Sequence, residues 1–145
     1  MKALRLVALL VVAACGKQAA APQTTVEFSL TQAGDSIPLY LGQEAKVDDV
    51  YMVLSDVTNE SRCARGVQCV WAGDAVASIT VHPPCIKQGC KAASFNLALH
   101  TNLEPRSGEG WGHKVQLLAL LPEPDINQPI DRSKYVAWVR VTKSQ

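Results

Sequence analysis

Apolar and polar residues alternate over several short stretches of this chain, and no stretch sustains the period of an α-helix. The alternation is clearest along 75–82 and 93–100, where the apolar side chains recur at every second position. This period is typical of strands that bury one face. A more continuous apolar run at 50–57 indicates a central strand.

The whole pattern predicts about seven strands. They are expected at 26–31, 37–41, 50–57, 70–82, 93–100, 115–121 and 135–142. Residues 33–36 are the expected turn of a first hairpin, and the proline-rich segment 122–133 suits a Greek-key return from one sheet to the other. We therefore expect an all-β fold, either an antiparallel sandwich or a small barrel.

The alternation also predicts which side chains face the core. The expected set is Phe28, Leu30, Ile79, Val81, Phe95, Leu97, Leu99, Val139 and Val141. A one-residue slip in register would expose each strand's set to water. If the ring of Phe95 is fully buried, its replacement by Ala should cost about 3–5 kcal/mol.

The N-terminus has the form of an export signal. Lys2 and Arg5 are followed by an apolar run that ends at Gly16, which is too short for a membrane-spanning helix of roughly 20 residues. The sequence Val-Ala-Ala-Cys closes the run at Cys15 and resembles the lipobox of bacterial lipoprotein precursors. An ordinary secretory signal, cleaved near Ala21, is the alternative.

The lipobox resemblance implies a signal peptide at 1–14, a lipidated tether at 15–24 and a single β-domain at 25–145. Cys15 would carry the acyl chains, palmitate among them, and two or more chains suffice for stable anchoring. Gly16 after the cysteine favours the outer membrane in that family. The implied location is the bacterial cell envelope.

Charge and composition limit the classes of binding partner that we expect. Lys and Arg total 14 and Asp and Glu total 13, so the charges nearly balance and no basic stripe points to nucleic acid. The hydrophobic fraction of 48% is ordinary for a globular domain with one core. The expected partners are the membrane, through the lipid, and a protein or another component of the envelope.

Four further cysteines suggest two disulfides, because an exported chain enters an oxidising compartment. A strand at 70–82 would hold Cys69 and Cys85 far apart, whereas bridged Cα atoms lie within about 7 Å. We therefore expect Cys63–Cys69 and Cys85–Cys90. The alternative of a four-cysteine zinc site is disfavoured by the same separation and by spacings looser than C-x-x-C.

The densest motif is S-R-C-A-R-G-V-Q-C-V-W-A-G-D-A at 61–75. It resembles a motif of small envelope lipoproteins of uncharacterised activity, in which a short disulfide loop leads through C-x-W-x-G into a long strand. Ala64 stands where that motif has proline. The resemblance implies a fold and a compartment. In physical terms, Trp71 is expected to pack over the bridge or cap the core, and Gly73 to allow a bulge or a close approach.

The residues of these loops favour a binding surface as the functional hypothesis. Hairpin pairing through Cys85–Cys90 would place His100 opposite Ala75, so the loop 101–112 should emerge beside the motif. Arg and Trp are enriched at binding hot spots, and loops at sandwich ends often carry function. The candidate binding residues are Arg62, Arg65, Trp71, Asp74, Arg106 and Trp111, with Glu104 and Glu109 nearby.

Signals of catalysis are weak. His82 and His100 lie too far apart to share a metal, and His113 could approach His100 with no evident third ligand, so no metal or cofactor is expected. We expect a non-enzymatic binding or envelope-structural module, with an exported inhibitor or partner-capture domain as the alternative. A hydrolase that uses Glu104 or Asp74 is a third, less favoured hypothesis.

Overall fold

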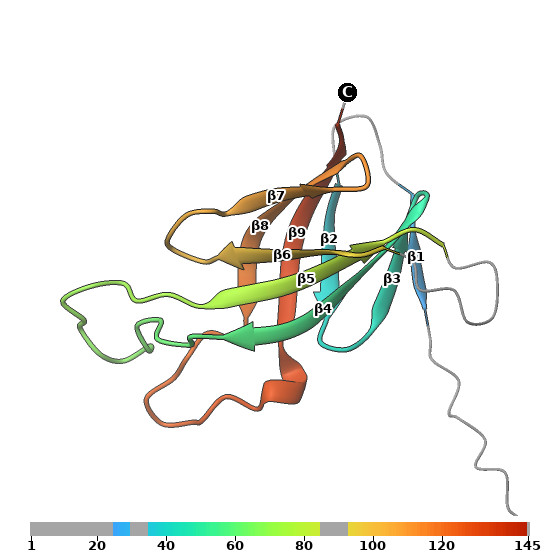
Figure 1. Cartoon of the computed structure of the whole chain (residues 1–145). Coiled ribbons are helices and arrows are strands. Elements are labelled where there is room, and N and C mark those ends of the chain that lie inside the picture. Colours follow the sequence, from blue (N-terminus) through green and yellow to red (C-terminus); the bar gives the residue numbers. More distant parts are fainter. Residues whose placement is uncertain (1–24, 30–34, 85–92, 145) are drawn as a thin grey trace, which may run out of the picture.

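The computed structural model describes residues 25–29, 35–84 and 93–144, and these fold into two packed β-sheets (Figure 1). One sheet has five strands in the order β1-β3-β4-β5-β6, and the other has four in the order β2-β9-β8-β7. The strands are β1 (Val26–Phe28), β2 (Asp35–Tyr40), β3 (Glu44–Val47), β4 (Val50–Thr58), β5 (Val76–His82), β6 (Phe95–His100), β7 (Ser107–Gly110), β8 (His113–Leu121) and β9 (Val136–Lys143). The predicted all-β sandwich is confirmed.

Helical structure in the described ranges is limited to one 3₁₀ turn, η1 (Arg132–Lys134), just before β9. No helix within those ranges is long and apolar enough to cross a membrane. The signal peptide, the tether and Cys15 lie outside the described residues.

The core lies between the two sheets and is filled by the alternating apolar positions. The predicted core residues Ile79, Val81, Leu97, Leu99, Val139 and Val141 are all buried. Phe28 is partly buried and packs against this cluster, whereas Leu30 lies outside the described residues. The predicted inward faces of β5, β6 and β9 are therefore confirmed, but the pairing of β5 with β6 is shifted by one residue, because His100 lies opposite Val76 and not opposite Ala75 as predicted.

Phe95 is the exception among the predicted core residues, because half of its side chain (50%) is exposed. It lies on the core side of β6, as a Cβ added to Gly110 of β7 would come within 3.1 Å of the Cβ of Phe95. However, Phe95 begins an edge strand at the open end of the sandwich. Trp111 contacts its ring edge-on, with the centroids 6.0 Å apart, and does not enclose it.

Strand connectivity differs from the prediction at two places. The first two strands do not form a hairpin: β1 pairs in parallel with β3, and β2 pairs with β9 in the other sheet. The segment 122–133 does not cross between sheets, because it links β8 and β9, which are antiparallel neighbours. The predicted Greek-key return is therefore wrong at this segment, which instead forms a long loop at one end of the sandwich.

Two of the strands, β3 and β7, escaped prediction. Strand β7 reads Ser-Gly-Glu-Gly and has no apolar residue to alternate. Its glycines are needed for close approach, since a Cβ on Gly108 would lie 3.0 Å from the side chain of Leu97. Strand β7 returns the chain along the sandwich, and this changes where the loop after β6 ends.

Candidate functional site

The β4–β5 hairpin continues beyond the sandwich as an arm formed by residues 59–75 (Figure 1). Backbone pairing persists into the arm, where Ser61 N donates to Asp74 O at 2.7 Å and Cys63 N to Ala72 O at 2.8 Å. The predicted strand at 70–82 is therefore regular only from Val76.

Gly73 makes this pairing possible. Its φ is +66°, and an added Cβ would lie only 1.8 Å from the carbonyl oxygen of Ser61. A side chain at this position would be strained by its backbone conformation and would collide with the opposite strand of the arm. The close approach expected at Gly73 is confirmed.

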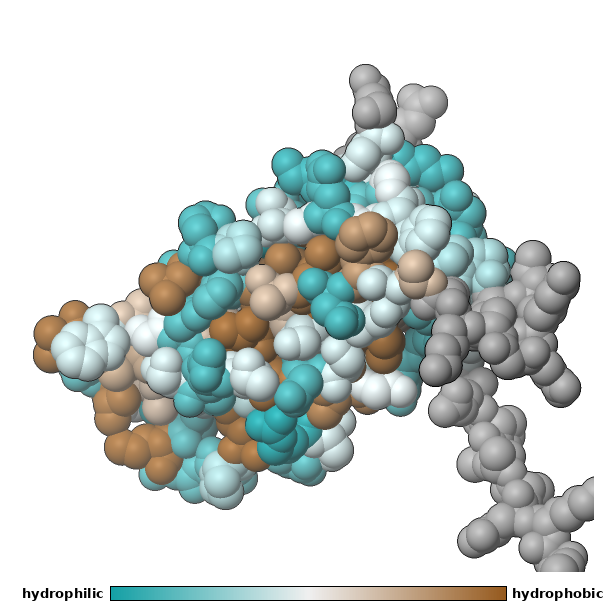
Figure 2. Space-filling model, in the orientation of Figure 1, coloured by the Kyte–Doolittle hydropathy of each residue, from teal (hydrophilic) through white to brown (hydrophobic). Residues whose placement is uncertain are grey.

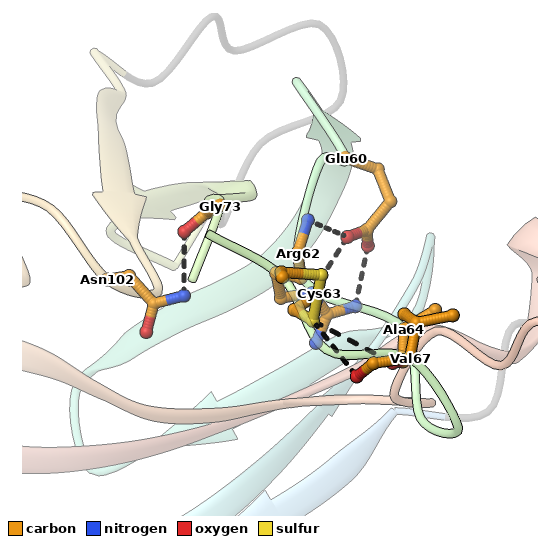
Figure 3. Close-up of a disulfide and its surroundings, with 8 residues drawn as sticks. Glu60, Arg62, Cys63, Ala64, Val67, Gly73 and Asn102 are labelled. Atoms are coloured by element: carbon orange, nitrogen blue, oxygen red, sulfur yellow. Dashed lines mark hydrogen bonds and ion pairs between the residues drawn. A yellow bond between two sulfur atoms is a disulfide. The ribbon is translucent and has the colours of Figure 1, made fainter. Parts of the chain in front are cut away.

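A disulfide closes the far part of the arm (Figure 3). Cys63 and Cys69 are bonded, with their Cα atoms 5.9 Å apart, which confirms the predicted pairing. A bridge over so short a loop contributes about 2 kcal/mol in the chain-entropy account. The second predicted bridge, Cys85–Cys90, lies outside the described residues and stays a prediction.

Arg62 fastens the base of the arm to the sandwich. Its guanidinium pairs with Glu60, and it donates to the carbonyl oxygens of Leu120 at 2.5 Å and Pro122 at 3.0 Å. The Tyr135 hydroxyl donates to the same Glu60 carboxylate at 2.8 Å. Only 10% of the Arg62 side chain is exposed, so this predicted binding residue acts from inside as an anchor.

Tyr135 and Glu60 influence each other's ionisation. Burial is the larger cause that raises the pKa of Tyr135 to about 12, and the hydrogen bond to Glu60 adds to it. Burial alone would raise the pKa of Glu60, but the hydrogen bonds from Arg62 and Tyr135 outweigh it and lower that pKa. The pair is therefore a neutral phenol and a carboxylate at neutral pH.

Asp74 ties the arm to the loop after β6. Its carboxylate accepts from His100 Nδ1 at 2.5 Å, from the Thr101 hydroxyl at 3.0 Å and from the Asn102 N–H at 3.0 Å. Asn102 also donates from its side chain to the carbonyl oxygen of Gly73 at 2.8 Å (Figure 3). Burial opposes ionisation of Asp74, but these bonds outweigh it and lower its pKa to about 2.

Large apolar side chains remain exposed on this end of the molecule. Val70 is 94% exposed and Trp71 is 77% exposed. We name the following set the apolar tip: Val67, Val70, Trp71, Leu103 and Ile126. In Figure 2, brown residues gather at the left end, where the arm projects. Trp71 neither packs over the disulfide nor caps the core, contrary to its expected structural role.

Contacts connect the parts of the apolar tip. Trp71 and Leu103 line one pocket of about 400 Å³, together with Ser61 and Asn102. A Cβ added to Gly66 on the arm would lie 3.3 Å from the side chain of Ile126. The arm, the loop after β6 and the loop 122–135 therefore meet at one end of the sandwich.

A second pocket, of about 390 Å³, lies beside the arm. It is lined by residues that include Arg62, Cys63, Arg106 and Glu123. Arg65, which is largely exposed, pairs with Asp125 at 3.4 Å. Arg65 and Arg106 thus lie at the end where the sequence placed them, as polar neighbours of the apolar tip.

Trp111 is not at this end. It sits in the turn between β7 and β8, and its indole N–H donates to the carbonyl oxygen of Ala93 at 3.1 Å, near the start of β6. The sequence interpretation treated 101–112 as one loop, whereas β7 carries the chain back to the opposite end. The predicted cluster of Trp71 with Trp111 is therefore wrong, and Glu109, within β7, also leaves the arm.

The remaining titratable groups near the arm that the structure describes are engaged by their neighbours. The Asp74 carboxylate accepts hydrogen bonds from His100, Thr101 and Asn102. The Glu104 carboxylate accepts from the Arg106 N–H at 2.9 Å. His100 is engaged by Asp74, while His113 begins β8 at the far end of the sandwich. His113 therefore does not approach His100 as the sequence suggested.

Sequence reasoning missed four residues of the apolar tip: Val67, Val70, Leu103 and Ile126. Each is an apolar residue in a turn-rich, polar stretch with no alternation around it, and that is the signal by which such residues can be recognised. Comparison with known proteins adds no family to this description, since no family model, no curated protein and no solved structure matches the chain.

Proposed function

We propose that this chain is a lipid-anchored protein of the bacterial envelope and that its β-sandwich is a non-enzymatic module that binds a protein partner through the apolar tip. The exposure of Val70 (94%) and Trp71 (77%) carries the proposal. Clustered apolar side chains on an otherwise polar surface are typical of interaction sites. Their burial in a complex would contribute roughly 25 cal/mol per Å² of apolar surface.

The construction of the arm supports this role. Its pairing across Gly73, its disulfide and the Arg62 anchor hold the exposed side chains in one arrangement before any partner arrives. A preorganised surface loses less conformational entropy on binding than a flexible loop. An arm that served only as a connection would have no need of these three constraints.

The pocket beside Trp71 favours a protein as the partner. Trp71 and Leu103 provide apolar walls, and Ser61 and Asn102 provide polar groups at the same pocket. Its volume of about 400 Å³ lies within the range of small-molecule and side-chain sites. A peptide segment with one large apolar side chain would fill the walls with that side chain and meet the polar groups with its backbone.

The position of β1, the first strand of the domain, is compatible with binding of a partner at the apolar tip. Strand β1 pairs with β3 beside the half of β4 that is remote from the arm. From Met52, opposite Ala45, to the end of β4 at Thr58 the strand spans roughly 20 Å. A lipid anchor attached before residue 25 leaves the apolar tip accessible to a partner in the aqueous space.

The hydrolase hypothesis is disfavoured by the state of Asp74. Its carboxylate is committed to three donors, and its low pKa keeps it ionised and unable to act as a general acid near neutral pH. Glu104 is held by the backbone of Arg106 on the exposed loop. These two carboxylates therefore stabilise loops in the proposed module.

Anchoring is tested by changing the lipidated residue. In a bacterial host that processes lipoproteins, the wild-type chain is expected in the membrane fraction and to incorporate labelled palmitate. The Cys15→Ser variant should be recovered outside the membranes and unlabelled. Equal membrane partition of the two proteins, or a wild-type chain without label, would contradict lipid anchoring.

Partner binding is tested by photo-cross-linking from the arm. Val70 is replaced by the photoreactive p-benzoylphenylalanine, and cells are irradiated before their envelopes are solubilised. We expect one defined protein adduct, which weakens when Trp71→Ala is added and persists when Trp138→Ala is added. Trp138 is the matched control, because it is an exposed tryptophan (37%) on the sandwich rather than on the arm.

Two other results would overturn the proposal. Adducts between copies of this chain would identify the tip as a self-association surface. Adducts with lipid alone, together with sedimentation of the unlipidated domain with phospholipid vesicles through Trp71, would identify it as a membrane-contacting surface. Identification of the cross-linked protein by mass spectrometry, followed by reconstitution with the purified partner, completes the positive result.

A further inference from the structure

A cluster of ionisable side chains lies at the end of the sandwich opposite the apolar tip. Asp48 and Asp49 form the two-residue turn between β3 and β4, and His113 is the first residue of β8. One ligand atom from each residue lies within 4.8 Å of the others. The two aspartates belong to the five-stranded sheet and the histidine to the four-stranded sheet, so the cluster bridges the two layers.

The hydrogen bond of His113 determines which ring nitrogen is available. Its Nδ1 lies 2.9 Å from the carbonyl oxygen of Trp111, and a carbonyl only accepts, so Nδ1 carries the proton. In the neutral imidazole, Nε2 then presents a lone pair. A ring nitrogen held to a backbone carbonyl in this way is the usual second contact of a metal-binding histidine.

The second nitrogen of His113 has no hydrogen-bond partner among the described residues, although it is buried. Only 2% of the side chain is exposed, and Nε2 faces Asp49 Oδ1 at 3.4 Å. Two electron-rich atoms that face each other repel unless a cation lies between them. A proton on Nε2 is one such cation, but 3.4 Å is longer than the usual N–H···O range of about 2.7–3.2 Å.

The same separation suits a metal ion. Bonds of about 2.0–2.1 Å from zinc to nitrogen and oxygen place tetrahedral ligands about 3.4 Å apart. We propose that Asp48, Asp49 and His113 bind a divalent cation of the zinc class. Three protein ligands leave a fourth position for water, and two carboxylates with a neutral imidazole balance the charge of the ion.

Lys143 is a charged neighbour of this site. Its ammonium lies 3.3 Å from Asp48 Oδ2, and 62% of its side chain is exposed. The exposed lysine can swing into solvent when the ion takes its place beside Asp48. The turn itself is preformed, because Asp48 has a φ of +51° and its N–H donates to the carbonyl oxygen of Phe28 at 3.1 Å.

Zinc binding to the purified full chain tests the proposal, after removal of metals by a chelator and without added reductant. Calorimetric titration with ZnCl₂ should show one ion per chain at this site, and the ion should raise the unfolding temperature. Asp48→Asn and Asp49→Asn should each weaken binding tenfold or more. Both variants are expected to fold, because Asn tolerates the positive φ of Asp48 and Asp49 is largely exposed.

His82→Gln is the matched control. His82 is a histidine that pairs with a carboxylate, that of Glu44 at 3.1 Å, but it lies outside the proposed site. This substitution should leave the zinc affinity unchanged. Cobalt substitution adds a spectroscopic readout: visible bands of a tetrahedral nitrogen and oxygen site should appear and be lost in Asp49→Asn. Failure of zinc to bind would leave a proton between His113 and Asp49 and overturn the proposal. Zinc binding that both aspartate variants retain, or cobalt bands of thiolate ligands, would overturn it as well.

Discussion

Asp74 shows how one residue can make two loops into a single surface. Its carboxylate collects donors from the loop after β6, while its backbone pairs with Ser61 on the other side of the arm. The sequence marked Asp74 as a binding residue because it stands in a dense motif. The structure assigns it a different task, since only 9% of the residue is exposed.

The lowered pKa of Asp74 predicts how stability depends on pH. Its pKa falls from the ordinary 3.8 to about 2 in the folded protein. The ionised carboxylate therefore stabilises the folded state above pH 4, and this contribution is lost as the pH falls from about 4 to about 2. Asp74→Asn should lower the free energy of unfolding at pH 6 and narrow the gap to the wild type towards pH 2. Urea unfolding measures this, and an equal gap at every pH would contradict it.

A comparison of substitutions at Gly73 and Gly42 tests the backbone pairing of the arm. Both have positive φ, +66° and +72°, but an added Cβ collides with Ser61 O at Gly73 and meets nothing within 4 Å at Gly42. Gly42→Ala should therefore cost about 1–2 kcal/mol of backbone strain alone. We expect Gly73→Ala to cost more than this, and comparable losses in urea unfolding would show that the arm does not pair across Gly73.

At the scale of the strand, Phe95 shows that a side chain can face the core without being buried in it. The residue is 50% exposed, and Trp111 contacts its ring edge-on. Phe95→Ala should therefore cost about 1–2 kcal/mol, less than the 3–5 kcal/mol of a fully buried phenylalanine. Leu99→Ala, at a buried position of the same strand, should cost about 2–5 kcal/mol. A larger loss for Phe95→Ala in urea unfolding would contradict the observed exposure.

Alternation along the chain was sufficient to predict most strands and their inward faces. It works for β5, β6 and β9 because each buries one face against the opposite sheet. It fails for β7, whose glycines leave no apolar pattern, and for β3, which is only four residues long. Alternation also says nothing about which strands pair, and this is why the predicted first hairpin was wrong.

For the whole molecule, the decisive unknown was the path of the chain after β6. The sequence correctly brought the motif and the first part of the following loop to one end, where Arg106 and Arg62 line the same pocket. It placed Trp111 there as well, because nothing in the residues 107–110 marks them as a strand. Because the four-residue strand β7 returns the chain along the sandwich, Trp111, one of the two proposed binding tryptophans, lies at the opposite end.

The two ends of the sandwich consequently have different chemistry. One end carries the clamped arm and the exposed apolar tip, and the other carries Asp48, Asp49 and His113 between the two sheets. A variant at one end is therefore expected to leave the other end's properties intact. Zinc affinity should be unchanged in Trp71→Ala, and partner capture should be unchanged in Asp49→Asn.

The exposed side chain of Trp71 is proposed to contribute to partner binding and not to the stability of the fold. The most direct measurement is the dissociation constant of the cross-linked partner for wild type, Trp71→Ala and Trp138→Ala, with the free energy of unfolding of each protein measured alongside. We expect Trp71→Ala to weaken binding at least tenfold while it changes the free energy of unfolding by less than about 0.5 kcal/mol, and Trp138→Ala to leave binding unchanged. A Trp71→Ala variant that binds like the wild type, or that loses binding only because it unfolds, would contradict this role of Trp71.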